Sequence, residues 1–254
     1  MCQLKYCVRY HYIKLKIKKL DCRQIPFTFD ILMYNRMIDF KKYTRFTIFF
    51  GILFMLNILF MYVLQDYRMV AKPMIMASLI GFYITVERRQ SNAFVLAMIF
   101  ALLGDVFLMF KGDDFFLIGL VCFMAMQLLY TYLFSREGSN DIKKLLIIGI
   151  PITLLTLVII SLLWSDLGEL RIPVLIYAMA ISGMVISAIY RKSTMNGYLS
   201  VVSGVILFLI SDAVLAISKF GGAIPYQDVV IMSTYMAAQF LIVIGMVAAH
   251  EFRR

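Results

Sequence analysis

Two aspartates lie inside long apolar stretches of this 254-residue chain. Asp105 stands in NAFVLAMIFALLGDVFLMF and Asp212 in YLSVVSGVILFLISDAVLAISKF, and both stretches are long enough to cross a bilayer. A carboxyl group at the bilayer centre costs roughly 3 kcal/mol or more, and it is retained where it faces a protein interior or a water-filled cavity. Carboxyl groups in such places donate, accept or relay protons. Both aspartates are therefore candidates for a functional site.

The composition limits which other groups could share this chemistry. Histidine occurs only as His11 and His250, near the two ends of the chain, so imidazole chemistry inside the membrane is not expected. The four cysteines are expected to be free thiols, because the spacing of Cys2 and Cys7 with His11 fits no standard zinc module. The available groups are then carboxyl, amide, phenol and lysine side chains. We expect no metal and no organic cofactor.

The elements that must position these groups are transmembrane helices. Hydrophobic residues make up 62% of the chain, charged residues 16%, and the mean hydropathy is +0.86, which excludes a soluble domain of this length. The apolar runs are continuous rather than alternating, which favours helices over a β-barrel. We predict an all-α integral membrane protein with a bundle of about eight transmembrane helices. The expected spans are residues 46–64, 72–86, 92–110, 115–134, 145–164, 172–190, 198–219 and 229–250.

The positions of the basic residues predict the orientation, because Lys and Arg near span ends are retained on the cytoplasmic side. If the basic N-terminus lies inside, Arg88, Lys143 and Arg253 also lie inside, whereas the acidic Asp113 and Asp114 lie outside. Both termini are thus predicted to be cytoplasmic, in a multi-pass protein of the plasma (inner) membrane. This asymmetry and anionic lipid headgroups explain the net charge of +10. No nucleic-acid partner is expected, and no oligomeric state is predicted.

Residues 1–44 are expected to form a basic N-terminal arm ahead of an eight-helix transmembrane domain at 45–254. The arm is rich in basic and aromatic residues but lacks the small-residue cleavage site of a secretory signal. Two interpretations of it stay open. It is either a juxtamembrane arm, or translation begins at Met33 or Met37, because MIDFKKYTRF leads directly into the first span.

The two aspartates are expected to lie close together. The third and seventh spans run in the same direction, and a rise of about 1.5 Å per residue puts both carboxyls at nearly the same depth in the outer half of the membrane. A single polar cavity could collect them with polar side chains of other spans. The candidate substrate-binding or orienting residues are Lys72, Gln127, Tyr130, Ser211, Tyr235 and Gln239.

These side chains also have structural interpretations. Buried Asp, Gln and Tyr often hydrogen bond between transmembrane helices as packing contacts, and Ser211 suits a close helix approach. Lys72 could simply extend to the outer interface. These alternatives and the site interpretation stay open together.

Two pairs of short motifs suggest an internal duplication. GDVFL at 104–108 resembles SDAVL at 211–215, and MAMQLL at 124–129 resembles MAAQFL at 236–241. Two four-helix halves related by an axis along the membrane normal would bring equivalent aspartates together near that axis. This arrangement is one possible form of the predicted bundle.

Five segments of the chain form a recognisable series. They are Lys72–Pro73, ALLGDVFLM at 101–109, FFLIGLVCF and the Tyr130 phenol within 115–130, GVILFLISDAVLA at 204–216 and TYMAAQFLI at 234–242. Taken in order, they resemble the YhhN family of polytopic membrane proteins, whose characterised members are lysoplasmalogenases. One departure concerns Gln127, because the family commonly has a histidine at that position. The resemblance covers most of the chain from about residue 46 to residue 250.

The resemblance implies hydrolysis of the vinyl ether bond of a lysoplasmalogen, a lysophospholipid, to a fatty aldehyde and glycerophospho-ethanolamine or -choline. Such a bond is cleaved by protonation of the alkene carbon and capture of the oxocarbenium ion by water, and glycosidases meet a related ion with two carboxyls. One Asp would be the protonated acid and the other an ionised stabiliser or base. The sequence does not assign the two roles, and Asp105 as acid with Asp212 as stabiliser is a first hypothesis. Lys72 is expected to meet the phosphate, with the chain lying between helices among membrane lipids.

Other functions also use intramembrane aspartates. A proton-coupled transporter of a small molecule or lipid is the main alternative, although Pro151 and Pro173 stand near span ends rather than interrupting matching spans. An intramembrane aspartyl protease is disfavoured because Leu102 occupies the position of a required glycine. A non-catalytic scaffold would use the aspartates only to join helices.

Overall fold

The fold is known from a computed structural model that covers most of the predicted membrane domain. The basic arm predicted at residues 1–44 lies outside the described part, apart from Tyr43 and Thr44. Both interpretations of that arm therefore stay predictions. The described residues are 43–62, 68–87, 90–139, 141–192 and 197–251.

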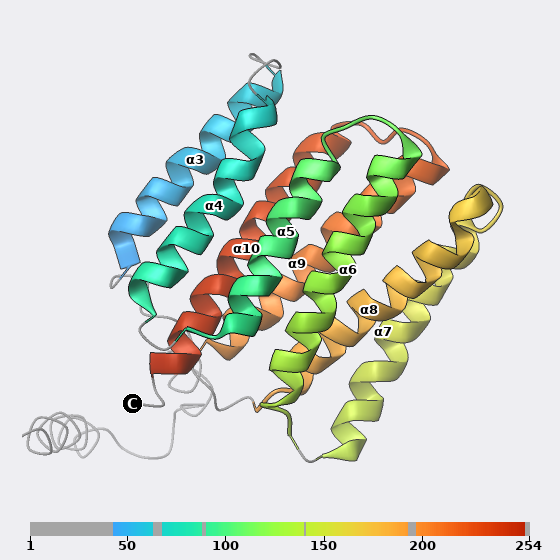
Figure 1. Ribbon diagram of the computed structural model, residues 1–254. Coiled ribbons are helices and arrows are strands. Elements are labelled where there is room, and N and C mark those ends of the chain that lie inside the picture. Colours follow the sequence, from blue (N-terminus) through green and yellow to red (C-terminus); the bar gives the residue numbers. More distant parts are fainter. Residues whose placement is uncertain (1–42, 63–67, 88–89, 140, 193–196, 252–254) are drawn as a thin grey trace, which may run out of the picture. The chain divides into compact units, whose positions relative to one another are not determined.

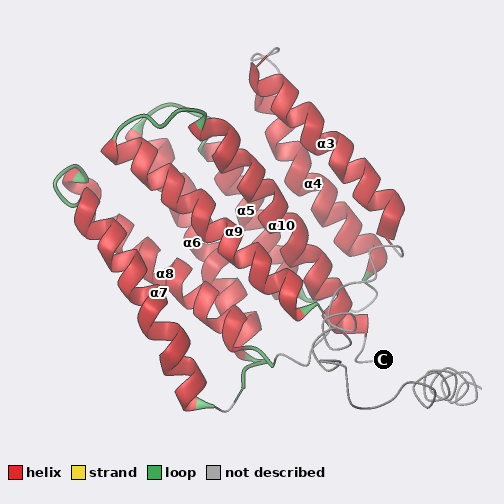
Figure 2. Ribbon diagram, turned by 180° about the vertical axis from the view of Figure 1, so that it is seen from behind, coloured by secondary structure: helices red, strands yellow, loops and turns green. Residues whose placement is uncertain are grey.

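Eight long α-helices joined by short loops make up nearly all of the described residues, and no strand is formed among them (Figure 1). The all-α prediction is confirmed, and each predicted span coincides with one helix. Successive helices alternate in direction, and the view from behind in Figure 2 shows the loops gathered at the helix ends. The helices are α3 (Thr44–Tyr62), α4 (Arg68–Val86), α5 (Asn92–Phe107), α6 (Asp113–Ser135), α7 (Ile142–Leu163), α8 (Arg171–Tyr190), α9 (Tyr198–Ala216) and α10 (Gln227–Glu251), with a 3₁₀ turn η3 (Gly168–Leu170) and a π-helical turn η4 (Ile217–Gly221).

Six of the described helices are long and apolar enough to cross a membrane, namely α3, α6, α7, α8, α9 and α10. Their outward surfaces are apolar as well: on α7, for example, the side chains of Ile147 and Leu162 are 73% and 74% exposed. Such surfaces suit contact with lipid rather than with water. The protein is therefore a multi-pass membrane protein. The apolar stretches of α4 and α5 are shorter, so the total of eight spans and the cytoplasmic termini remain predictions.

Helix α10 packs at the centre of the described bundle. It contacts α9, α4 and α3, and most of its side chains between Tyr235 and Ala249 are buried. The contact with α9 is the most extensive in the bundle, and α5 with α6 comes second. Small residues allow the first contact: a Cβ placed on Gly204 would lie 2.8 Å from the backbone oxygen of Ala238. These two tightly packed hairpins carry the repeated motifs and both aspartates.

A buried ion pair joins the connector after α6 to the end of α8. The Arg191 guanidinium is fully buried and donates from Nε to Glu137 Oε2 over 2.8 Å. Backbone hydrogen bonds run alongside it, from the amide of Ser139 to the carbonyl of Tyr190 and from the amide of Lys192 to the carbonyl of Glu137. The sequence places both charged residues in polar connectors, yet the structure uses them to fix the ends of α6 and α8 against each other.

Candidate active site

Asp105 lies in the last turn of α5, among charged and phenolic side chains of two other helices. Lys72 of α4 places its ammonium 3.7 Å from Asp105 Oδ1, and the Tyr235 hydroxyl of α10 donates to Oδ2 over 2.7 Å. The carboxyl residue is only 1% exposed. In such a water-poor setting a nearby ammonium offsets part of the cost of burying a carboxylate charge. Asp105 is thus held as one partner of a buried ion pair.

Asp212 of α9 has different neighbours. The Tyr177 hydroxyl of α8 donates to Oδ2, and Gln127 Nε2 of α6 approaches the same oxygen at 3.4 Å. Within the described residues no salt bridge reaches Asp212, and both hydrogen bonds end on Oδ2. The second oxygen, Oδ1, therefore remains available to another molecule.

A third polar group lies among buried side chains of α6 and α10. The Tyr130 hydroxyl donates to Gln239 Oε1 over 3.3 Å, and Gln239 Nε2 lies 3.3 Å from the sulfur of Met126. Ser211 donates to the backbone oxygen of Ile231 over 3.0 Å, which joins α9 to α10. These contacts have the form of helix-to-helix hydrogen bonds, the structural alternative foreseen for such residues.

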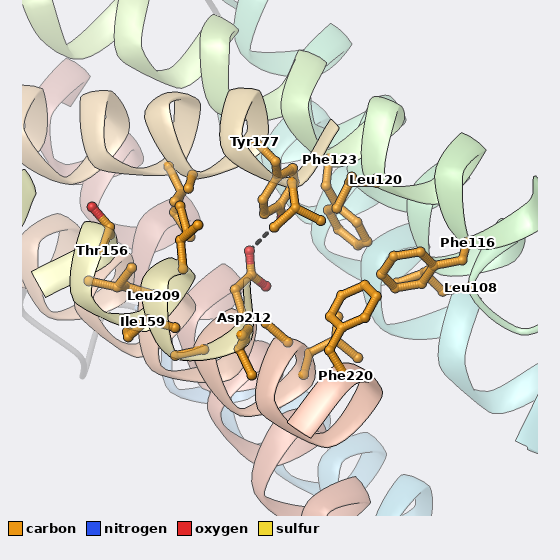
Figure 3. Close-up of a pocket in the computed structure, with 18 residues that line it drawn as sticks. Leu108, Phe116, Leu120, Phe123, Thr156, Ile159, Tyr177, Leu209, Asp212 and Phe220 are labelled. Atoms are coloured by element: carbon orange, nitrogen blue, oxygen red, sulfur yellow. Dashed lines mark hydrogen bonds between the residues drawn. The ribbon is translucent and has the colours of Figure 1, made fainter. Parts of the chain in front are cut away.

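An apolar pocket borders Asp212 between α6, α7, α8 and α9 (Figure 3). It is partly open to the surroundings, and the space in it that can hold the centre of a water-sized sphere is about 80 Å³. Of the predicted site residues, only Asp212 lines it. The pocket therefore differs from the single polar cavity expected from the sequence, because apolar side chains supply almost all of its wall. Its polar lining residues are Thr156, Tyr177 and Asp212.

Phe123 connects the two aspartate environments. Its ring lines the Asp212 pocket and also lies 5.9 Å, edge to face, from the ring of Tyr235, which holds Asp105. The two aspartates thus belong to one region of the bundle, but they face different parts of it.

The contact between Tyr177 and Asp212 was not predicted from the sequence. Tyr177 stands in the apolar run RIPVLIYAMAISGMVISAIY, which contains no acidic residue and no amide. A phenol in such a run is an ordinary packing residue, and only the rotation of α8 shows that its hydroxyl meets Asp212. Among the described residues, no group of three or more His, Cys, Asp and Glu side chains could hold a metal ion.

Comparison with known families agrees with the motifs. The YhhN family matches residues 67–246, which is more than half of the chain. The chain belongs to the YhhN family. The matched range includes both aspartates and all five segments that carried the resemblance, which is therefore confirmed.

Curated relatives in this family share about three residues in ten with the chain. The bovine lysoplasmalogenase TMEM86A (Bos taurus) is 27% identical over 182 residues, or 68% of this chain and 71% of the relative. The human TMEM86A (Homo sapiens) is 28% identical over 163 residues, covering 61% and 65%. The human lysoplasmalogenase TMEM86B is 32% identical over 149 residues, covering 59% and 61%. The chain therefore spans three fifths to seven tenths of the length of these relatives. No solved structure matches it.

Proposed function

We propose that this chain is an intramembrane hydrolase that cleaves the vinyl ether bond of lysoplasmalogens to a fatty aldehyde and glycerophospho-ethanolamine or -choline. The names of its relatives support this reaction class. The observation that carries the proposal is Asp212, a carboxyl group with one free oxygen that lines an apolar pocket. Such a pocket suits an alkenyl chain, whose vinyl ether would then lie beside the acid.

The surroundings of the two aspartates support a division of roles. Lys72 favours the ionised form of Asp105, whereas Asp212 has no cationic partner among the described residues. We therefore assign Asp212 as the protonated acid and Asp105 as the ionised stabiliser. This assignment reverses the one first made from the sequence, where the position of Lys72 relative to each carboxyl was unknown.

In the proposed reaction, the Asp212 carboxylic acid transfers its proton to the alkene carbon that is not bonded to oxygen. The other alkene carbon becomes an oxocarbenium ion, which the negative charge of Asp105 stabilises through the low-dielectric interior. Water attacks this carbon and gives a proton back to the Asp212 carboxylate, as in the second step of retaining glycosidases. The hemiacetal then breaks into an aldehyde and the free glycerol hydroxyl, and the net change is the addition of one water.

Gln127 is proposed to orient the attacking water. Its side chain is fully buried beside Asp212, and its Oε1 has no hydrogen-bond partner among the described residues. A buried carbonyl oxygen left without a donor costs about 1–3 kcal/mol, which a bound water would offset. The amide thus provides an acceptor for water where the family commonly has a histidine.

We further propose that the enzyme acts in the plasma (inner) membrane with both termini in the cytoplasm. The excess of basic residues on one set of connectors supports this orientation. The transporter alternative receives no support from the relatives, which are named as lysoplasmalogenases.

The test is aldehyde release from a vinyl-ether lysophospholipid by the detergent-purified full chain. Asp212→Asn and Asp105→Asn are each expected to lower kcat by roughly 10²-fold to 10⁴-fold, because general acid catalysis and charge stabilisation contribute on that scale. Asp166→Asn, at an exposed loop residue, is the matched control. Gel filtration and a thermal melt of each variant show that the fold is retained.

An acyl lysophospholipid serves as the substrate control. The proposal is supported if the wild type releases aldehyde from the vinyl-ether lipid and not from the acyl lipid. This release should be lost in the Asp105 and Asp212 variants and kept in the Asp166 variant. Wild-type rates in either the Asp105 or the Asp212 variant contradict the mechanism with two carboxyls.

A further inference from the structure

One end of the Asp212 pocket carries an exposed ion pair. Lys219 Nζ lies 2.9 Å from Asp113 Oδ1, and the two side chains are 36% and 76% exposed. The Lys219 ammonium also lies 5.0 Å from the centre of the Phe116 ring. Phe116 lines the pocket, as does Phe220, the residue after Lys219. A cation and an anion thus stand at the border of an apolar pocket.

The interior of the pocket has the opposite character. Figure 3 shows Phe116 and Phe220 together at one end, Asp212 in the middle, and Thr156 and Leu209 towards the other end. No Lys or Arg occurs among the residues that line it. The interior therefore has no group that would bind a phosphate, whereas it suits a hydrocarbon chain.

We propose that Lys219 and Asp113 bind the zwitterionic phosphoethanolamine headgroup of the substrate, with Lys219 at the phosphate and Asp113 at the ammonium. The alkenyl chain then runs past Asp212 towards Leu209. This inference rests on the proposed vinyl-ether substrate and deepens it, because it names the headgroup. A carboxylate accepts N–H hydrogen bonds from an ethanolamine ammonium but none from a trimethylated choline, so ethanolamine is the preferred headgroup.

The spacing along the chain agrees with this placement. Lys219 lies seven positions after Asp212, a step that corresponds to roughly 10 Å of helix. Six bonds lie between the vinyl ether carbon and the phosphorus of a lysoplasmalogen, and an extended chain of six bonds spans about 7 Å. The long lysine side chain covers the remaining distance. A vinyl ether held at Asp212 thus places its phosphate within reach of Lys219.

Lys219 takes the role that the sequence suggested for Lys72. The ammonium of Lys72 lies beside the buried Asp105, and its side chain is only 14% exposed. An exposed ion pair such as Lys219 with Asp113 contributes little to stability, so its partners can be exchanged for a ligand at small cost. The headgroup would replace one exposed ion pair by two.

The test measures binding rather than turnover, so that it does not depend on hydrolysis. The ligand is a saturated-ether lysophosphoethanolamine, which has no vinyl bond to cleave, titrated calorimetrically into the detergent-solubilised full chain. Lys219→Gln is expected to raise Kd about tenfold, which corresponds to the loss of one charge-assisted contact. Lys111→Gln, at another exposed lysine before α6, is the control and should bind as the wild type does.

Two further ligands distinguish the contribution of Asp113 at the ammonium from that of Lys219 at the phosphate. Asp113→Asn is expected to weaken the phosphoethanolamine ligand but not the matching ether with a bare phosphate. An alkylglycerol without phosphate should bind equally to the wild type and to Lys219→Gln. Unchanged phosphoethanolamine binding by Lys219→Gln, or an equal loss with the alkylglycerol, overturns the headgroup site. Failure of wild-type aldehyde release, in contrast, overturns the proposed hydrolysis and leaves these binding results to be judged separately.

Discussion

The two buried aspartates of this protein lie in different environments. Asp105 lies beside an ammonium and accepts from Tyr235, whereas Asp212 accepts from Tyr177 and lines an apolar pocket. In a low-dielectric interior such neighbours decide which carboxyl holds a proton. Two aspartates can therefore serve as acid and as ionised stabiliser without any difference between the residues themselves.

Tyr177→Phe tests whether the phenol positions the acid. The change removes the hydroxyl that donates to Asp212 Oδ2 and keeps the ring. We expect kcat to fall roughly 10-fold to 10²-fold with little change in KM. Asp212 becomes a carboxylate as its proton leaves, and a hydrogen bond to a charged group contributes about 1.5–3 kcal/mol. Steady-state aldehyde release measures both constants.

Tyr132→Phe is the control for that substitution, since this tyrosine is 55% exposed on α6. A purely structural role for Tyr177 would lower the melting temperature and leave the kcat of the folded protein unchanged. A rise in KM of the same size, with kcat unchanged, would assign Tyr177 to substrate binding instead.

At the scale of elements, the sequence predicts where the helices lie but not how they face each other. Each span is an apolar run ended by charged or small residues, so its bounds follow from composition alone, as with α8, expected at 172–190 and found at Arg171–Tyr190. The pairing of Lys72 with Asp105 depends on which helices are neighbours and how each is rotated. Each span is apolar around nearly its whole circumference. The sequence therefore contains no polar face that would indicate how the helix is rotated.

The contact between α9 and α10 gives a prediction about stability. A Cβ on Gly204 would lie 2.7 Å from Ile242 Cγ1 and 2.8 Å from the carbonyl oxygen of Ala238, so Gly204→Ala must separate the helices. Overpacking of this kind costs roughly 1–3 kcal/mol. We expect the melting temperature in detergent to fall by several degrees.

Gly81→Ala on α4 is the matched control, because nothing lies within 4 Å of its Cβ position. Alanine also favours a helix more than glycine does, so this variant should melt at or above the wild-type temperature. A similar loss in both variants would contradict the role of the close approach of α9 to α10, because helix propensity alone favours alanine at both positions.

At the scale of the whole membrane domain, the proposed reaction depends on which side of the bilayer the pocket mouth faces. Asp113 begins α6 and Lys219 follows α9, and the distribution of basic residues predicts that these ends are outside. A lysophospholipid of the outer leaflet would then enter with its headgroup at the surface and its chain between helices. The orientation thus determines which leaflet supplies the substrate.

Labelling with a membrane-impermeant maleimide in intact cells tests this orientation. In a background without the four native cysteines, Lys111→Cys is expected to react at once, because it precedes α6 on the predicted outer side. Lys143→Cys, near the start of α7 on the predicted inner side, should react only after the membrane is permeabilised. The opposite pattern would place the pocket mouth in the cytoplasm, and the inner leaflet would then be the source of substrate. Labelling of both residues in intact cells would contradict a single orientation, and with it the assignment of the basic connectors to one side.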